Sequence, residues 1–137
     1  MVAVEREQSG SGVAARVLIG VAAWLVPGLG HLLQRRWPRG LVLFLAVGAL
    51  AVTGALLRGV LFAVHAGDLR SDPLTFLGSL GDAGSGVFYW VVRWLEKAGP
   101  DVSRATGDYG TRFIAAAGVA NYLCVADALE IALRRKE

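Results

Sequence analysis

Residues 41–57 read LVLFLAVGALAVTGALL, a run of seventeen positions without a charged side chain. An α-helix rises about 1.5 Å per residue, so this run, continued past Arg58 to residue 66, can cross a hydrocarbon core of about 30 Å. We therefore predict a transmembrane helix over 41–66, with the Arg58 side chain reaching the far interface.

The composition of the whole chain agrees with a membrane class. Of its 137 residues, 55% are apolar and 18% are charged, and the mean hydropathy is +0.52. Disordered chains are poor in apolar residues, and this length allows one domain, so the composition excludes disorder and a large soluble enzyme. A small integral membrane protein remains.

The apolar run before this helix, residues 13–33, is interrupted two-thirds of the way along. Pro27 removes a backbone donor, and Gly28 and Gly30 loosen the helix around it. We predict either a kinked helix that crosses the membrane or a re-entrant turn, and the sequence leaves both open. Residues 1–12 are polar and contain glycines at their end, which predicts a mobile tail.

The second half of the chain predicts another transmembrane helix and an amphipathic section. Residues 112–134 are largely apolar and are followed by cations. Residues 73–98 carry apolar and polar side chains at helical spacing, which indicates an amphipathic helix or a broken pair of helices at the interface. We place Ser79 and Asp82 on the polar side of this section and expect a break at 82–86, where glycines cluster.

The fold class that follows is an all-α integral membrane protein, a single domain over 13–137. It has two to three membrane-embedded helices and an extracytoplasmic amphipathic section. The net charge of +3 is concentrated in clusters beside apolar runs, which predicts cytoplasmic anchors on anionic lipid headgroups of a bacterial inner membrane and no nucleic-acid binding. These anchors are Arg35, Arg36, Arg39, Arg134 and Arg135.

Polar residues within the apolar runs are the candidate functional residues, because each is costly there unless it is paired or wetted. His31 either faces a hydrated pocket at the broken turn or hydrogen-bonds a carbonyl near the cytoplasmic interface. Asp127 either pairs with an arginine of the 35–39 loop or binds a proton or an ion. Asn121 is expected to form hydrogen bonds between helices, and Glu130 is expected to pair with Arg134.

A stripe of small residues on the last helix predicts close packing of another helix. Ala116, Ala120 and Cys124 recur at four-residue spacing on the face that carries Asp127. Cys124 is the only cysteine, so neither an intrachain disulfide nor a thiolate metal cluster can form. No catalytic motif is present, so we expect no enzyme activity, no cofactor and no metal site.

Two sequence blocks resemble a family of small bacterial multi-pass membrane proteins that is known only as a domain of unknown function. The first is AWLVPGLGH at 23–31, followed by an arginine-rich turn and GLVLF at 40–44. The second is DYGT at 108–111, AGVANYL at 117–123 and VADA at 125–128. The first block also resembles the proline-glycine turn of the two-transmembrane-helix domain family. The resemblance implies a multi-pass membrane protein without an established activity or catalytic residue.

Two functional hypotheses follow from these patterns. The first is a structural or accessory subunit that associates with itself or with another membrane protein, through the small-residue face of the last helix and the proline-glycine turn. The second is an oligomeric minimal transporter or channel element. In that case the broken segment from Pro27 to Gly30 and the side chains of His31 or Asp127 would line the path.

Overall fold

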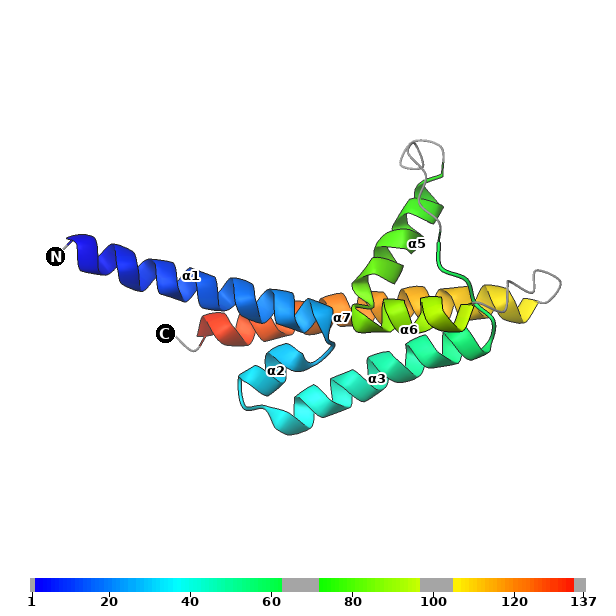
Figure 1. Ribbon diagram of the computed structural model, residues 1–137, viewed down its shortest axis with the longest axis horizontal. Coiled ribbons are helices and arrows are strands. Elements are labelled where there is room, and N and C mark those ends of the chain that lie inside the picture. The colour runs from blue at the N-terminus through cyan, green and yellow to red at the C-terminus, as the bar shows by residue number, and fades with distance from the viewer. Residues whose placement is uncertain (1, 63–71, 97–104, 135–137) are drawn as a thin grey trace.

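The computed structural model describes residues 2–62, 72–96 and 105–134, and within these ranges the chain is all-helical (Figure 1). The predicted all-α architecture is therefore confirmed. The longest helix, α7, runs along the molecule, and α1, α3 and α5 each pack against it. The helices are α1 (Val2–Leu25), α2 (Leu29–Leu33), α3 (Trp37–Leu56), α5 (Pro73–Gly84), α6 (Val87–Leu95) and α7 (Ala105–Arg134).

The close contact of α3 with α7 depends on glycines at the crossing. A Cβ atom added to Gly54 would lie 2.6 Å from the Gly110 carbonyl oxygen, and the reverse substitution would meet the Gly54 carbonyl oxygen at the same distance. Without side chains at these positions, the two backbones touch directly. Beside this crossing, Val47, Ala51, Phe88, Val92, Ile114 and Ala117 form the buried core with Cys124.

The packing face of α7 is not the stripe of small residues that we expected. Ala116 is exposed, whereas Ala120 is half-buried against the core and Cys124 is buried in it, so the prediction is wrong at Ala116. The buried residues instead alternate at four- and three-residue spacing, the average of 3.5 that keeps side chains on one side of a helix. They are Gly110, Ile114, Ala117, Asn121, Cys124 and Ala128, and Gly118 beside them is buried as well.

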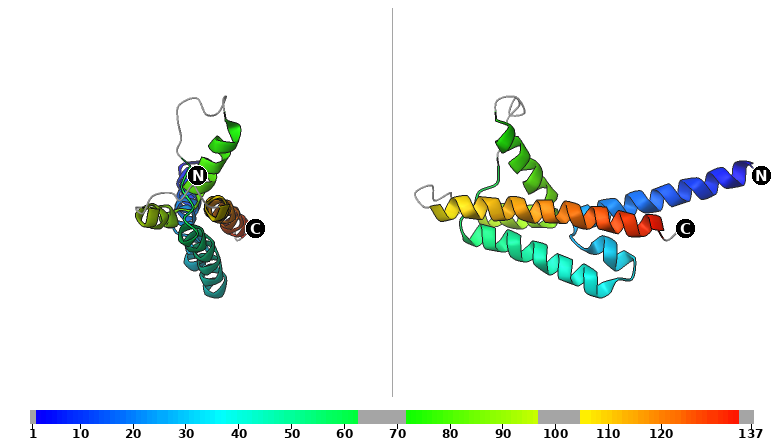
Figure 2. Two further views of the ribbon diagram at one scale, coloured as in Figure 1. Left: turned by 90° about the vertical axis from the view of Figure 1, so that its right-hand side faces the viewer. Right: turned by 180° about the vertical axis from the view of Figure 1, so that it is seen from behind.

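The break predicted at the proline-glycine turn reverses the chain. Gly28 has a φ of 81°, a left-handed conformation that glycine adopts without steric cost, and α2 begins at the next residue. Because α2 runs back beside the start of α3, the start of α1, the α2–α3 turn and the end of α7 lie at the same end of the molecule (Figures 1 and 2). The helix α1 also includes residues 2–12, which we had assigned to a mobile tail.

Two predicted helix boundaries are wrong. The helix predicted over 41–66 ends at Leu56, because the chain turns at Arg58, which has a positive φ of 57°. Residues 57–62 are not helical, and 63–66 lie outside the described residues. The last helix begins at Ala105, seven positions before the predicted 112.

The amphipathic section is a broken pair of helices, as predicted, but the buried side of α5 is the opposite of the expected one. The chain breaks between Gly84 and Val87, where Gly86 has a φ of 60°. Ser79 and Asp82, which we placed on the polar side, are both buried. Leucines occupy the exposed side of this helix: Leu74, Leu77 and Leu80.

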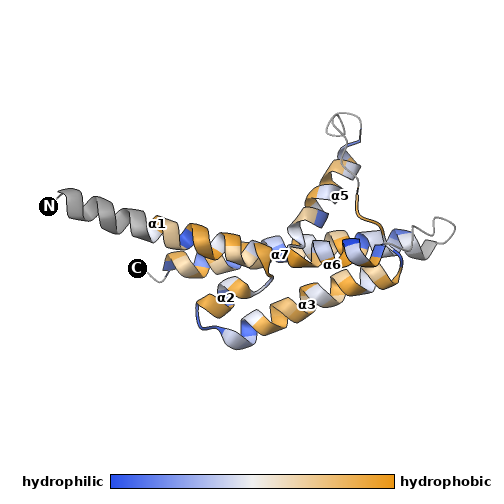
Figure 3. Ribbon diagram, viewed as in Figure 1, coloured by the Kyte–Doolittle hydropathy of each residue, from blue (hydrophilic) through white to orange (hydrophobic). Residues whose placement is uncertain are grey.

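Two helices, α3 over its 20 residues and α7 over the 28 residues Gly107–Arg134, are long and apolar enough to cross a membrane. The core helix of a soluble protein passes the same test, but it is mostly buried. In α3 only 22% of the apolar window is buried, and in α7 39% is. Figure 3 shows that apolar residues extend along α3 and along the half of α1 that leads into α2, so much of the molecular surface is apolar.

Adjacent alanines on α7 test which face packs. We expect Ala117→Leu to lower the free energy of unfolding by about 1–3 kcal/mol, because Ala117 is fully buried and extra methyl groups force the core apart. The matched change Ala116→Leu, at an exposed position, should alter the free energy of unfolding by less than about 0.5 kcal/mol. Denaturant unfolding in maltoside micelles measures both, and equal losses would contradict the assignment.

Candidate functional site

His31 is fully buried, as is Asn121 among the predicted candidates, and the turn at Gly28 positions it. The left-handed Gly28 starts α2, and its carbonyl oxygen accepts hydrogen bonds from the backbone N–H groups of His31 and Leu32. The short helix therefore directs His31 toward α7, and the side chain is 0% exposed. The predicted hydrated pocket or carbonyl partner is replaced by a carboxylate.

The carboxylate of Asp127 on α7 joins His31 and Arg39. His31 Nε2 lies 2.7 Å from Asp127 Oδ2. Arg39 Nη2 lies 3.1 Å from the same oxygen and 3.2 Å from Oδ1. The expected partner of Asp127, a cation from the loop that follows the broken turn, is therefore confirmed in Arg39, and the carboxylate contacts a histidine as well.

The side chain of Gln34 joins α2 to α7 beside His31. Its side-chain Nε2 donates to the carbonyl oxygen of Gly30 at 3.1 Å and to that of Ala128 at 2.8 Å. Gly30 is needed at this contact, because a Cβ atom there would lie 2.9 Å from the Cβ of Ala128. The backbone of α2 is thus held directly against α7, one residue away from Asp127.

A cavity of about 350 Å³ opens on the Asp127 side of this cluster. It contains three arginine side chains and two carboxylates, with one apolar residue. Arg134 pairs with Glu130, an i,i+4 ion pair with a distance of 2.5 Å, as the sequence predicted. The lining residues are Arg36, Arg39, Asp127, Glu130, Ile131 and Arg134.

The contact with Asp127 fits one neutral tautomer of His31. When His31 is neutral and Nε2 carries the hydrogen, Asp127 accepts that hydrogen bond and Nδ1 is left as an acceptor. Nδ1 is buried and has no hydrogen-bond partner among the residues that the structure describes. Arg39 balances the negative charge of Asp127 and is itself half-exposed, with 52% of its side chain accessible.

Asn121 lies away from the cluster around Asp127, where α1 and α5 end against α7. Its Nδ2 donates to the Trp24 carbonyl oxygen at the end of α1, at 2.9 Å, and to the Gly84 carbonyl oxygen at the end of α5, at 2.8 Å. Both oxygens belong to the last turns of their helices, where carbonyl groups lack helical partners. The predicted hydrogen bonding between helices is confirmed at Asn121.

The remaining predicted residues fall around the cluster. Pro27 is buried within the turn, whereas Arg35 and Arg36 are exposed, and Arg135 lies outside the described residues. The sequence analysis missed the contact of His31 with Asp127, because 96 positions separate them. It also missed Gln34, although a polar side chain next to the arginine cluster was a visible signal.

The described residues contain no group of three or more histidine, cysteine, aspartate or glutamate side chains placed to hold a metal ion.

The buried histidine makes the role of Asp127 testable. Replacing Asp127 by alanine leaves His31 Nε2 buried without its acceptor, so we expect a loss of about 1–3 kcal/mol in the free energy of unfolding. Glu130→Ala removes an exposed ion pair on the same helix and should cost less than about 0.5 kcal/mol. Denaturant unfolding in micelles compares the two, and a loss at Asp127 no larger than at Glu130 would refute the coupling.

Comparison with known proteins agrees with the suspected membership. The family model described as "Family of unknown function (DUF6677)" matches residues 18–137. These residues include both sequence blocks, the broken turn, His31 and Asp127. No curated protein matches the chain, and no solved structure does. Because the match covers most of the chain, this protein belongs to the DUF6677 family of unknown function.

Proposed function

We propose that this chain is a small integral membrane protein that acts as a structural or accessory subunit. The exposed apolar side chains of α3 support a lipid environment, since water would disfavour such a surface. In this arrangement α3 and α7 cross the bilayer. The broken pairs α1–α2 and α5–α6 then enter from opposite sides and meet near its middle, at Asn121.

The arginines favour one orientation. Those described in the α2–α3 turn and at the end of α7 lie at one end of the molecule, together with the start of α1 (Figure 1). The positive-inside rule assigns that end to the cytoplasm, where the arginines contact anionic headgroups. The first hydrophobic segment is then re-entrant, and both ends of the described chain are cytoplasmic.

The outer face of α3 supports association with a second copy. The turn at Gly28 and Cys124 are buried inside the protein and Ala120 is half-buried, which leaves only Ala116 of the expected interface exposed. On α3, however, Ala46, Ala49 and Thr53 are all exposed and share one face, at three- and four-residue spacing. Small residues at this spacing let two helices approach closely in lipid.

Disulfide crosslinking tests this association. We expect Ala49→Cys to give a crosslinked dimer on oxidation in native membranes, whereas Leu41→Cys, exposed on another side of α3, should not. Cys124 is buried and can stay in place, so the unchanged protein serves as a second control. Electrophoresis without reductant separates the products. Monomer alone from Ala49→Cys would contradict association through this face, and a product of another mass would identify a different partner.

A second candidate function is proton or ion transport by an oligomer, and the contact between His31 and Asp127 favours it. The buried His31 contacts the partly exposed Asp127, which lines a polar cavity, and Nδ1 of His31 is unpaired among the described residues. We expect proteoliposomes containing the protein to collapse a pH gradient, as read with an entrapped pH-sensitive dye. Asp127→Asn should reduce the rate at least tenfold, whereas Glu130→Gln should not. Absence of flux with the unchanged protein would exclude this function.

A further inference from the structure

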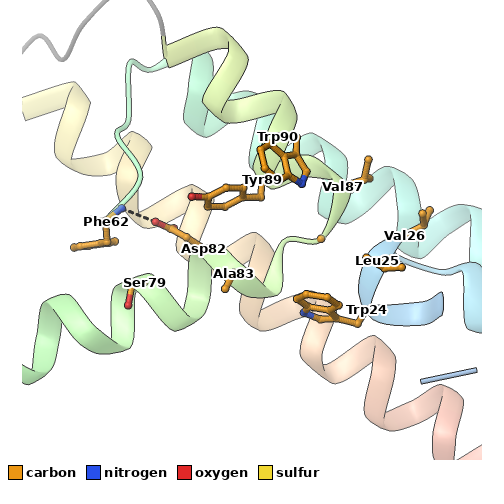
Figure 4. Close-up of a pocket in the computed structure, with 11 residues that line it drawn as sticks. Trp24, Leu25, Val26, Phe62, Ser79, Asp82, Ala83, Val87, Tyr89 and Trp90 are labelled. Carbon is orange, nitrogen blue, oxygen red and sulfur yellow. Dashed lines mark hydrogen bonds between the residues drawn. The ribbon is translucent and has the colours of Figure 1, made fainter. Parts of the chain in front are cut away.

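A second cavity, of about 450 Å³, lies where α1 ends against α5 and α6 (Figure 4). It is distinct from the cluster around Asp127, and no residue is shared between the two linings. Its walls are mostly apolar, with aromatic rings from Trp24, Phe62, Tyr89 and Trp90. A volume of this size suits a small organic molecule.

Among the described residues that line this cavity, Asp82 is the only one with a charged side chain, and it is 1% exposed. Its Oδ2 accepts a hydrogen bond of 2.6 Å from the backbone N–H of Phe62. Its Oδ1 is buried and has no hydrogen-bond partner within the described ranges. One oxygen of this buried carboxylate therefore lacks a hydrogen bond, which costs free energy unless a ligand donates one.

Burial disfavours the charged form of the Asp82 carboxylate, the Glu96 carboxylate also disfavours it, and the hydrogen bond from Phe62 favours it. A cation bound beside Asp82 would favour the charged form further. Because Glu96 is also acidic, the nearest charges disfavour a second anion.

The partner that fits these surroundings is a cation with an apolar body. An ammonium group donates hydrogen bonds to a carboxylate and is attracted to the faces of tryptophan and tyrosine rings. Figure 4 shows Asp82 and Tyr89 toward one end of the cavity and Trp24, Leu25 and Val26 toward the other. A phosphate next to the ammonium, as in phosphatidylethanolamine, would find no cationic side chain in the lining.

We propose that this cavity binds a small organic amine, with its ammonium group at Asp82 Oδ1 and its apolar body against the aromatic side chains. Ala83, Val87 and Trp90 line the cavity and are also exposed, so the site reaches the molecular surface and a ligand can enter. The site depends neither on His31 and Asp127 nor on association through α3, so its test is independent of the proposed functions.

Calorimetric titration of the full-length protein in maltoside micelles with 2-phenylethylamine tests this site, with 2-phenylethanol as the neutral probe. We expect saturable binding of the amine and at least tenfold weaker binding of the alcohol. Asp82→Asn keeps an oxygen for the Phe62 N–H but removes the charge, and should weaken amine binding at least tenfold. Ala83→Phe should weaken binding of both probes, because the new ring fills the cavity.

The matched control is Asp108→Asn, which removes one exposed carboxylate from the first turn of α7 and should leave binding unchanged. Equal binding of the amine to the unchanged protein and to Asp82→Asn would overturn the proposal, as would equal binding of the alcohol and the amine. Added phosphatidylethanolamine should not displace the amine. Displacement would assign the cavity to a lipid headgroup instead.

Discussion

The arrangement of the helices depends on one amide side chain on α7. Asn121 donates to the last carbonyl groups of two broken helices, one from each half of the chain. Those carbonyls would otherwise end inside the protein without partners, at a cost comparable to a lost hydrogen bond for each. Asn121 thus allows α1 and α5 to end against the middle of α7, where each chain segment then turns back.

The turn after α1 creates the polar cluster. Because the chain reverses at Gly28, the short helix α2 presents His31 and Gln34 to α7 instead of continuing away from it. The turn after α5 acts in the same way on the other cavity, since the aromatic residues of α6 are brought opposite Asp82. The larger cavity therefore lies where α1 and α5 end, whereas the cavity beside Asp127 lies between the start of α3 and the end of α7. Both contain a carboxylate whose neighbours come from distant parts of the chain.

The orientation of α5 explains why its polar residues are inside. The helical spacing places Ser79 and Asp82 on the polar side of an amphipathic section at the membrane interface, the side that faces water in such a helix. In the structure leucines face outward and Asp82 faces the cavity. The inversion is consistent with apolar surroundings, because a polar side chain then finds its hydrogen bonds only within the protein.

The sequence by itself determined the helical class, the two long apolar helices and the positions of both breaks. These features are local, because charge-free runs, prolines and glycines act on their own segments. It also identified His31, Asn121 and Asp127 as polar residues that need partners. Only the tertiary structure decided which residues are those partners, which face of α7 packs against the other helices and which side of α5 is buried. Such contacts join positions as far apart as 31 and 127, and they depend on how the chain reverses and how closely glycines let its helices approach.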